Sequence, residues 1–148
     1  HYRARRQRQM CIRDSLYSEN SLVAMRAMNG VKRIIKDDKK VFLKNKDRFL
    51  NQFSNSKHNV VKLGLITIYF DFLNHFEEKE VSKIKTIVLN WTKNSSDWMI
   101  LAQGMKLLEK LSKSDKSLKL KLIEVAKRLK NDERKVVRTK AQKILEDN

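Results

Sequence analysis

Residues 135–145 read KVVRTKAQKIL and carry the helical pattern that decides the fold. Val137, Ala141 and Ile144 are spaced by four and then three residues, and Leu145 follows directly, so all four fall on one face of an α-helix. The positions between them are mostly polar. The stretch therefore predicts an amphipathic helix that buries one stripe of apolar side chains.

The same stripe occurs three more times upstream, at a nearly constant interval. The four copies begin at Val23, Val61, Ile100 and Val137, which are 38, 39 and 37 residues apart. A second set of apolar columns lies between them and consists of Phe49, Ile87 and Val125; Leu50, Val88 and Ala126; and Phe53, Trp91 and Leu129. Two helix types therefore alternate. We expect the first type at 19–36, 58–76, 97–112 and 134–146, and the second at 39–53, 79–92 and 116–130.

Composition and connections agree with an all-helical chain. The 148 residues include no Pro, only 3 Gly and 34% charged residues. Short polar connections, such as 54–57, 94–97 and 131–134, offer Ser, Asn or Asp as N-caps and predict antiparallel hairpins. A hairpin cannot cover its own apolar face, so we expect an all-α protein whose hairpins stack into an α-solenoid of about three and a half repeats. An ordinary seven-helix bundle is the alternative.

The C-terminal unit resembles a HEAT repeat. Its matching residues are Asp132 in the turn, then Val136, Val137, Arg138, Ala141 and Leu145. The unit that contains Asp97 and Ile100 matches more loosely. The unit before it has Lys62 in place of the arginine. The chain also lacks the proline that first helices of HEAT repeats often carry. The resemblance implies a HEAT-like repeat domain over 19–148, with the first helix type lining a concave face, and it implies binding or scaffolding work.

The first fifteen residues, HYRARRQRQMCIRDS, differ from the rest of the chain. They contain five arginines opposed only by Asp14. They resemble the translation of a sequencing-library adapter joined to a truncated reading frame, and a genuine phosphate-binding arm is the alternative. We therefore expect 1–18 to be a non-native or disordered basic segment and the chain to be a fragment. A lost upstream helix would leave Met25, Met28 and Ile35 partly exposed.

The formal net charge is +17, from 34 Lys and Arg against 17 Asp and Glu. A surplus of Lys, Asn and Ile is also typical of AT-rich genomes, so the charge alone does not identify a partner. The candidate concave-face binding residues are Arg26, Lys62, Lys106, Arg138, Lys140 and Lys143. Glu109 and Glu146 interrupt this column of cations. We expect a scaffold or adaptor that binds a protein partner, and the alternative is a basic groove for DNA or RNA.

Patterns for metal binding or catalysis are not found. His58 and His75 are 17 residues apart on one expected helix, too far apart to share a metal ion. Gly30, Gly64 and Gly104 stand alone within expected helices, as close-packing positions rather than a phosphate loop. We therefore expect no catalytic residue, no metal, no cofactor and no small-molecule substrate.

The resemblance admits one enzymatic alternative, since some DNA alkylation-repair glycosylases are built from HEAT-like repeats and use aromatic residues and an Asp. Trp91, Asp97 and Trp98 would be the candidates, but Trp91 continues a core column and Asp97 occupies an N-cap position. We therefore expect a protein that is not an enzyme.

Cys11 is the only cysteine, so the chain cannot form an internal disulfide, which fits a reducing compartment. The apolar stretch 63–70 is too short to cross a bilayer, so we expect no membrane partner. We expect a bacterial, cytoplasmic protein.

Overall fold

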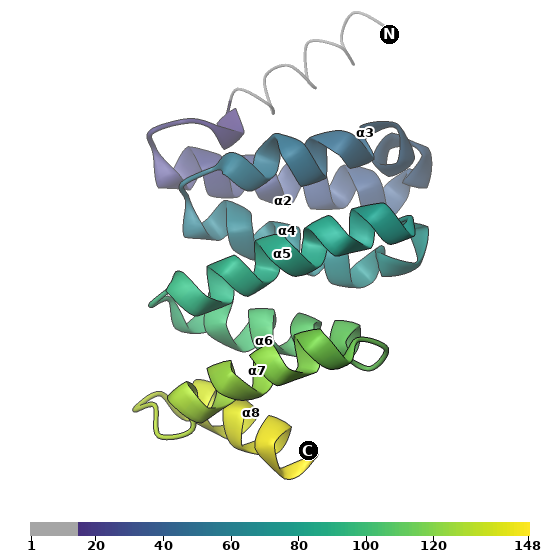
Figure 1. The fold of residues 1–148 in the computed structure, drawn as a ribbon. Helices are drawn as coiled ribbons and strands as arrows, with labels where there is room; N and C mark the ends of the chain where they lie inside the picture. Colours follow the sequence, from purple (N-terminus) through teal and green to yellow (C-terminus); the bar gives the residue numbers. More distant parts are fainter. Residues whose placement is uncertain (1–14) are drawn as a thin grey trace, which may run out of the picture. The chain divides into compact units, whose positions relative to one another are not determined.

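The computed structural model describes residues 15–148, and every regular element in this part of the chain is helical (Figure 1). The α-helices are α2 (Ser21–Asp37), α3 (Lys39–Asn51), α4 (Asn59–Asp71), α5 (Glu78–Asn94), α6 (Trp98–Ser112), α7 (Lys116–Leu129) and α8 (Lys135–Glu146). Two 3₁₀ turns, η1 (Phe53–Asn55) and η2 (Leu73–His75), follow α3 and α4. The predicted all-α class is confirmed for these residues. None of these helices combines the length and apolar character that crossing a membrane requires.

Helix packing divides the described residues into two compact units, one ending at Phe76 and the other beginning at Glu77. In the first unit, α2 packs against both α3 and α4. In the second unit, α6 packs against α5, α7 and α8, while α5 also contacts α7. Each unit is thus built from hairpins whose alternate helices lie side by side, as stacked repeats require. A solenoid that continues through both units stays a prediction.

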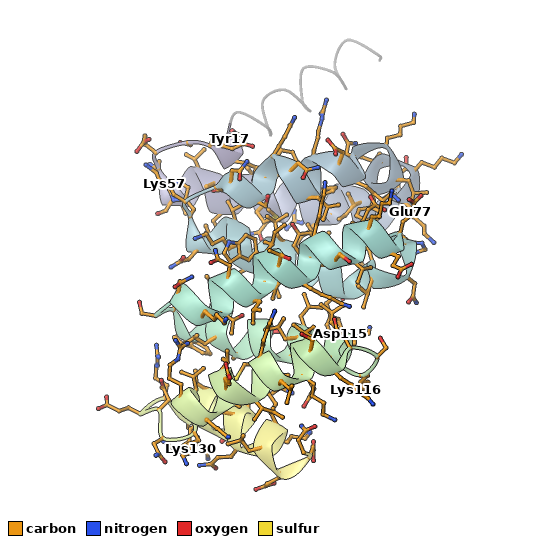
Figure 2. All side chains as sticks on the ribbon, viewed as in Figure 1. Tyr17, Lys57, Glu77, Asp115, Lys116 and Lys130 are labelled. Atoms are coloured by element: carbon orange, nitrogen blue, oxygen red, sulfur yellow. The ribbon has the colours of Figure 1, made fainter. Side chains whose placement is uncertain are left out.

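Side-chain caps account for where several helices begin. The N-cap residues whose side chains accept hydrogen bonds from first-turn backbone N–H groups are Asn20, Asp38, Asp97 and Asp115. The Asp97 carboxylate accepts from the backbone N–H groups of Met99 and Ile100 at 2.9 and 3.1 Å, which confirms its predicted N-cap role. Asp115, labelled in Figure 2, also pairs with Lys85 of α5 at 2.9 Å, so this cap ties α7 to α5.

The repeated columns form the core of both units. Val61, Ile100 and Val137, which begin three copies of the first stripe, are each 0% exposed. The second helix type buries two complete columns: Leu50, Val88 and Ala126; and Phe53, Trp91 and Leu129. The prediction that Trp91 is a core residue is therefore confirmed. The spacing read from the sequence locates the buried face of most helices correctly because both helix types keep one face against their neighbours.

Helix α2 buries only part of the predicted stripe, since Ala27 and Val31 are 8% and 7% exposed but the ends of the stripe are not buried. Val23, which begins the predicted stripe, and Ile34, which lies one turn beyond Val31 on the same face, are each 37% exposed. The residues that follow them in sequence, Ala24 and Ile35, are 0% and 2% exposed instead. The helix is rotated relative to the prediction because adjacent apolar residues offered two possible stripes, and packing against α3 and α4 selects the second.

The predicted exposure of Met28 and Ile35 is wrong, since Met28 is only 1% exposed. The Met28 side chain fills the space that the missing side chain of Gly64 leaves on α4, where an added Cβ would lie 2.2 Å from the Met28 Cγ. Of the three residues predicted to be partly exposed, only Met25 is, at 37%.

Residues 1–14, which hold most of the segment predicted to be non-native or disordered, lie outside the described residues. The end of that segment packs against the first unit, because Leu16 is fully buried. The backbone carbonyl of Leu16 accepts a hydrogen bond from the Ser56 hydroxyl, and the carbonyl of Ser18 contacts the His58 ring. The described part of the first unit thus includes residues that precede α2.

The three glycines differ in how closely another helix approaches them. Gly64 and Gly104 are close-packing positions as predicted, since an added Cβ would lie 2.2 Å from the Met28 Cγ in one case and from the Thr92 Oγ1 in the other. The same prediction for Gly30 is wrong, because no atom outside its own helix lies within 4 Å of an added Cβ.

Replacing Gly30 with alanine is therefore expected to stabilise the protein by about 0.5–1 kcal/mol, the gain in helix propensity without a packing cost. The measurement is urea unfolding followed by far-UV circular dichroism. A lower urea midpoint in Gly30→Ala would contradict the open environment that the structure gives this position.

Candidate binding surface

The candidate cations are distributed over both units. Arg26 and Lys62 belong to the first unit, on α2 and α4. The other four lie on α6 and α8 in the second unit: Lys106, Arg138, Lys140 and Lys143. Because α6 and α8 pack directly against each other, these four share one helix pair.

Neighbouring groups of the protein engage the side chains of Lys140 and Arg138. The Lys140 Nζ lies 2.8 Å from a carboxylate oxygen of Glu109, and the side chains are 21% and 28% exposed. The Arg138 Nη1 donates to the backbone carbonyl of Asp132 at 3.0 Å, so its guanidinium folds back towards the turn before α8. Lys106 and Lys143 are exposed. The helix pair therefore presents fewer available cations than the sequence predicted.

The turn before α8 is held by a network centred on Asp132. Its carboxylate accepts from the Arg134 backbone N–H and Nε, both at 2.9 Å, and from Nη2 at 3.0 Å. The Arg134 Nη1 donates to the backbone carbonyl of Ser96 at 2.5 Å, which ties the start of α8 to the residues before α6. The Arg134 side chain and backbone N–H lower the pKa of Asp132 to about 2. This aspartate, predicted to be the turn Asp of a HEAT-like unit, thus orients the arginine that ties the start of α8 to the residues before α6.

Acidification is expected to weaken this network. Since the folded pKa of Asp132 is about 2 and an unperturbed Asp titrates near pH 4, the stabilisation is complete above about pH 4 and is lost as the pH falls through about 2. The difference in unfolding free energy between the wild type and Asp132→Asn should therefore shrink over this interval. Urea unfolding at several pH values measures it, with Glu133→Gln, at an exposed neighbouring carboxylate, as the control. A pH-independent difference would contradict the role of the Asp132 charge.

Exposed apolar side chains lie at the same end of α6 and α8. Trp98 and Met99, in the first turn of α6, are 45% and 40% exposed, and Val136, in the first turn of α8, is 54% exposed. The Arg134 bond to the Ser96 carbonyl holds the starts of these two helices together. Trp98, unlike Trp91, therefore has no role in the core. The second unit thus exposes apolar side chains at the starts of α6 and α8 and lysines further along the same two helices, and we call this surface the α6–α8 face.

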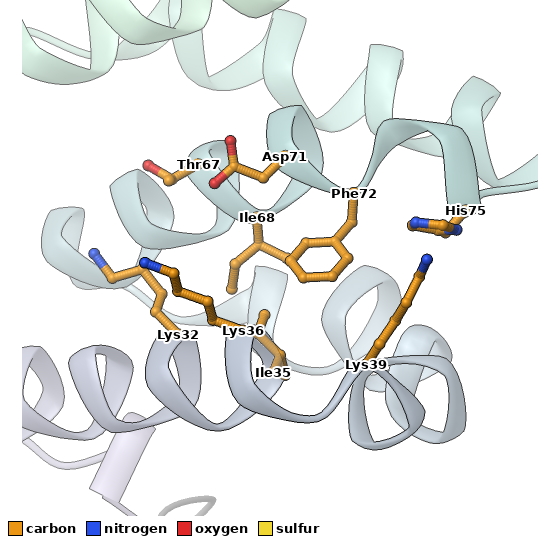
Figure 3. Close-up of a pocket in the computed structure, with 9 residues that line it drawn as sticks. All are labelled: Lys32, Ile35, Lys36, Lys39, Thr67, Ile68, Asp71, Phe72 and His75. Carbon is orange, nitrogen blue, oxygen red and sulfur yellow. The ribbon is translucent and has the colours of Figure 1, made fainter.

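The first unit contains a hollow of about 490 Å³ that the sequence analysis did not identify (Figure 3). Its lining residues are Lys32, Ile35, Lys36, Lys39, Thr67, Ile68, Asp71, Phe72 and His75. Three lysines therefore line one hollow between α2, α3 and α4. The spacing of four residues places Lys32 and Lys36 on one face of α2, which is a signal that the sequence contains, whereas Lys39 begins α3 and joins them only through the fold.

Histidine, cysteine and carboxylate side chains do not gather in groups of three or more that could hold a metal ion anywhere in residues 15–148. His58 precedes the first turn of α4, and His75 lies in η2. Comparison of the chain with protein families, curated proteins and solved structures gives no match in any of the three.

Proposed function

We propose that this chain is a non-enzymatic helical-repeat binding module, a scaffold or adaptor of the HEAT type, that binds an acidic protein partner through the α6–α8 face. The exposure of Trp98, Met99 and Val136 at the starts of α6 and α8 carries this proposal. Tryptophan and methionine are enriched in protein interfaces, and exposed tryptophans often dominate the binding energy. The formal charge of +17 favours a partner of opposite sign and accelerates its approach.

The state of the cations on this face favours a protein over a nucleic-acid backbone. A phosphate backbone is best bound by a series of available cations, each of which displaces counterions. On the α6–α8 face, Lys140 is neutralised by Glu109 and Arg138 is turned back onto backbone carbonyls. Asp97, the residue that the glycosylase alternative requires, uses its carboxylate to cap α6. These contacts support a binding role without catalysis.

Selection of peptides from a random library against the full chain tests the proposal. We expect the selected peptides to combine Asp and Glu with apolar residues, and we expect Trp98→Ala to weaken their binding about tenfold or more. The matched control is Leu120→Ala on α7, where the side chain is 66% exposed but lies outside this face.

Two results would overturn the proposal. The first is peptide binding that Leu120→Ala weakens as much as Trp98→Ala does. The second is single-stranded DNA that binds more tightly than any selected peptide and whose affinity falls steeply with salt, which would favour the basic-groove alternative.

A further inference from the structure

The hollow in the first unit is lined by cations at its edges and by apolar side chains between them. In Figure 3, Lys32 and Lys36 extend from α2 at one side, and Lys39 points towards His75 at the other. Between them lies Phe72, which is half-buried and stacks on Phe42 with ring centroids 4.3 Å apart. The buried side chains of Ile35 and Ile68 complete the apolar floor.

The positive charge of the hollow is not balanced within the described part of the chain. None of Lys32, Lys36 and Lys39 forms an ion pair with a carboxylate of residues 15–148. Asp71 is the only acidic residue among the lining residues. In Figure 3 its carboxylate lies at the rim, on the α4 side, away from the Phe72 ring. Three ammonium groups and one carboxylate leave an excess of two positive charges, with His75 counted as neutral.

We propose that this hollow binds a phosphate monoester whose phosphate group is attached to a small apolar body. A phosphate monoester carries a charge close to −2 at neutral pH and three strong acceptor oxygens, which matches the charge excess. Lysine binds phosphate as a point charge and suits a pocket whose cations come from one face of α2 and the start of α3. A carboxylate would offset only half of the excess. This site needs no protein partner and therefore goes beyond the proposed function.

The apolar floor predicts a preference among anions that titration calorimetry and NMR measure directly. Phenyl phosphate should bind several-fold more tightly than inorganic phosphate, because its ring buries apolar surface against Phe72 and the two isoleucines. It should also bind more tightly than benzoate, which has the ring but a single charge. The largest amide shift changes should occur at Thr67 of α4 and His75 of η2, which both line the hollow. Benzoate binding as tightly as phenyl phosphate would overturn the proposal.

Substitution of single lysines tests whether the hollow itself is the site. Lys36→Gln and Lys39→Gln should each weaken phenyl phosphate about 3- to 10-fold, since each removes one charged donor from the phosphate. The matched control is Arg33→Gln, which removes one charge from an exposed position of α2 that does not line the hollow. Circular dichroism verifies that each variant is folded. If Arg33→Gln weakens phenyl phosphate binding equally, the affinity depends only on the net charge of the protein, and the proposal is wrong.

A phosphotyrosine peptide distinguishes the two possible sources of the phosphate monoester. A peptide that binds more tightly than phenyl phosphate, with the same loss in Lys36→Gln, would identify a phosphorylated protein segment as the occupant. Equal affinity would identify a small phosphorylated molecule. Failure of both compounds to bind at up to about 10 mM would overturn the site without bearing on the α6–α8 face.

Discussion

Replacing Phe42 with alanine is expected to lower the unfolding free energy of the first unit by about 3–5 kcal/mol. Phe42 is 0% exposed and lies at the centre of an aromatic cluster. Its ring centroid is 4.3 Å from that of Phe72, 5.3 Å from that of Phe76 and 5.6 Å from that of Phe49. Truncation removes the ring that joins α3 to the end of α4, and these neighbours can close the cavity only partly because they belong to different elements.

The measurement compares two optical signals during urea unfolding. Far-UV circular dichroism follows all helices, whereas tryptophan fluorescence follows the second unit, because Trp91 and Trp98 both lie in it. The matched control is Leu43→Ala, the next residue on α3, whose side chain is 45% exposed and whose loss should change stability by less than about 0.5 kcal/mol. Similar effects of the two substitutions on the circular dichroism transition would refute the central role of the Phe42 ring.

Sequence periodicity predicted the helices well because most of them have a single apolar stripe. In α8, Val137, Ala141 and Ile144 are all 0% exposed, and lysine or arginine occupies much of the remaining surface. In α2, by contrast, Val23 and Ala24 are both apolar, so the periodicity is compatible with two rotations of the helix. The choice depends on the contact of Met28 with Gly64, 36 residues away, which a local pattern cannot contain.

The ends of helices were harder to predict than their buried faces, and the end of α4 lines the hollow of the first unit. The predicted helix 58–76 ends as an α-helix at Asp71 and continues as the tighter turn η2, which the apolar pattern does not reveal. This change places Phe72 and His75 beside the lysines of α2 and α3. Likewise, the sequence identified Glu109 as an interruption among the cations but could not show that it neutralises Lys140, because that pairing depends on how α6 and α8 align.

Replacing Gly104 with alanine is expected to destabilise the second unit by about 1–3 kcal/mol, although alanine favours a helix. An added Cβ would lie 2.2 Å from the Thr92 Oγ1. Thr92 is 0% exposed, and its hydroxyl donates to the Val88 carbonyl at 2.7 Å. A buried β-branched side chain has few alternative rotamers, so α5 and α6 must move apart to accept the methyl group.

A second substitution isolates this clash from other effects of the added methyl group. In the double variant Thr92→Ala and Gly104→Ala, the opposing hydroxyl is absent, so most of the lost stability should return. Gly64→Ala provides a comparison in the first unit, followed by circular dichroism, because its Cβ would meet the Cγ and Sδ of Met28, an unbranched side chain with more rotamers than threonine. Urea unfolding followed by the fluorescence of Trp91, adjacent to Thr92 in sequence, measures the effect. The double variant could instead be no more stable than Gly104→Ala alone. That result would refute the clash between the added methyl group and Thr92 as the cause of the lost stability.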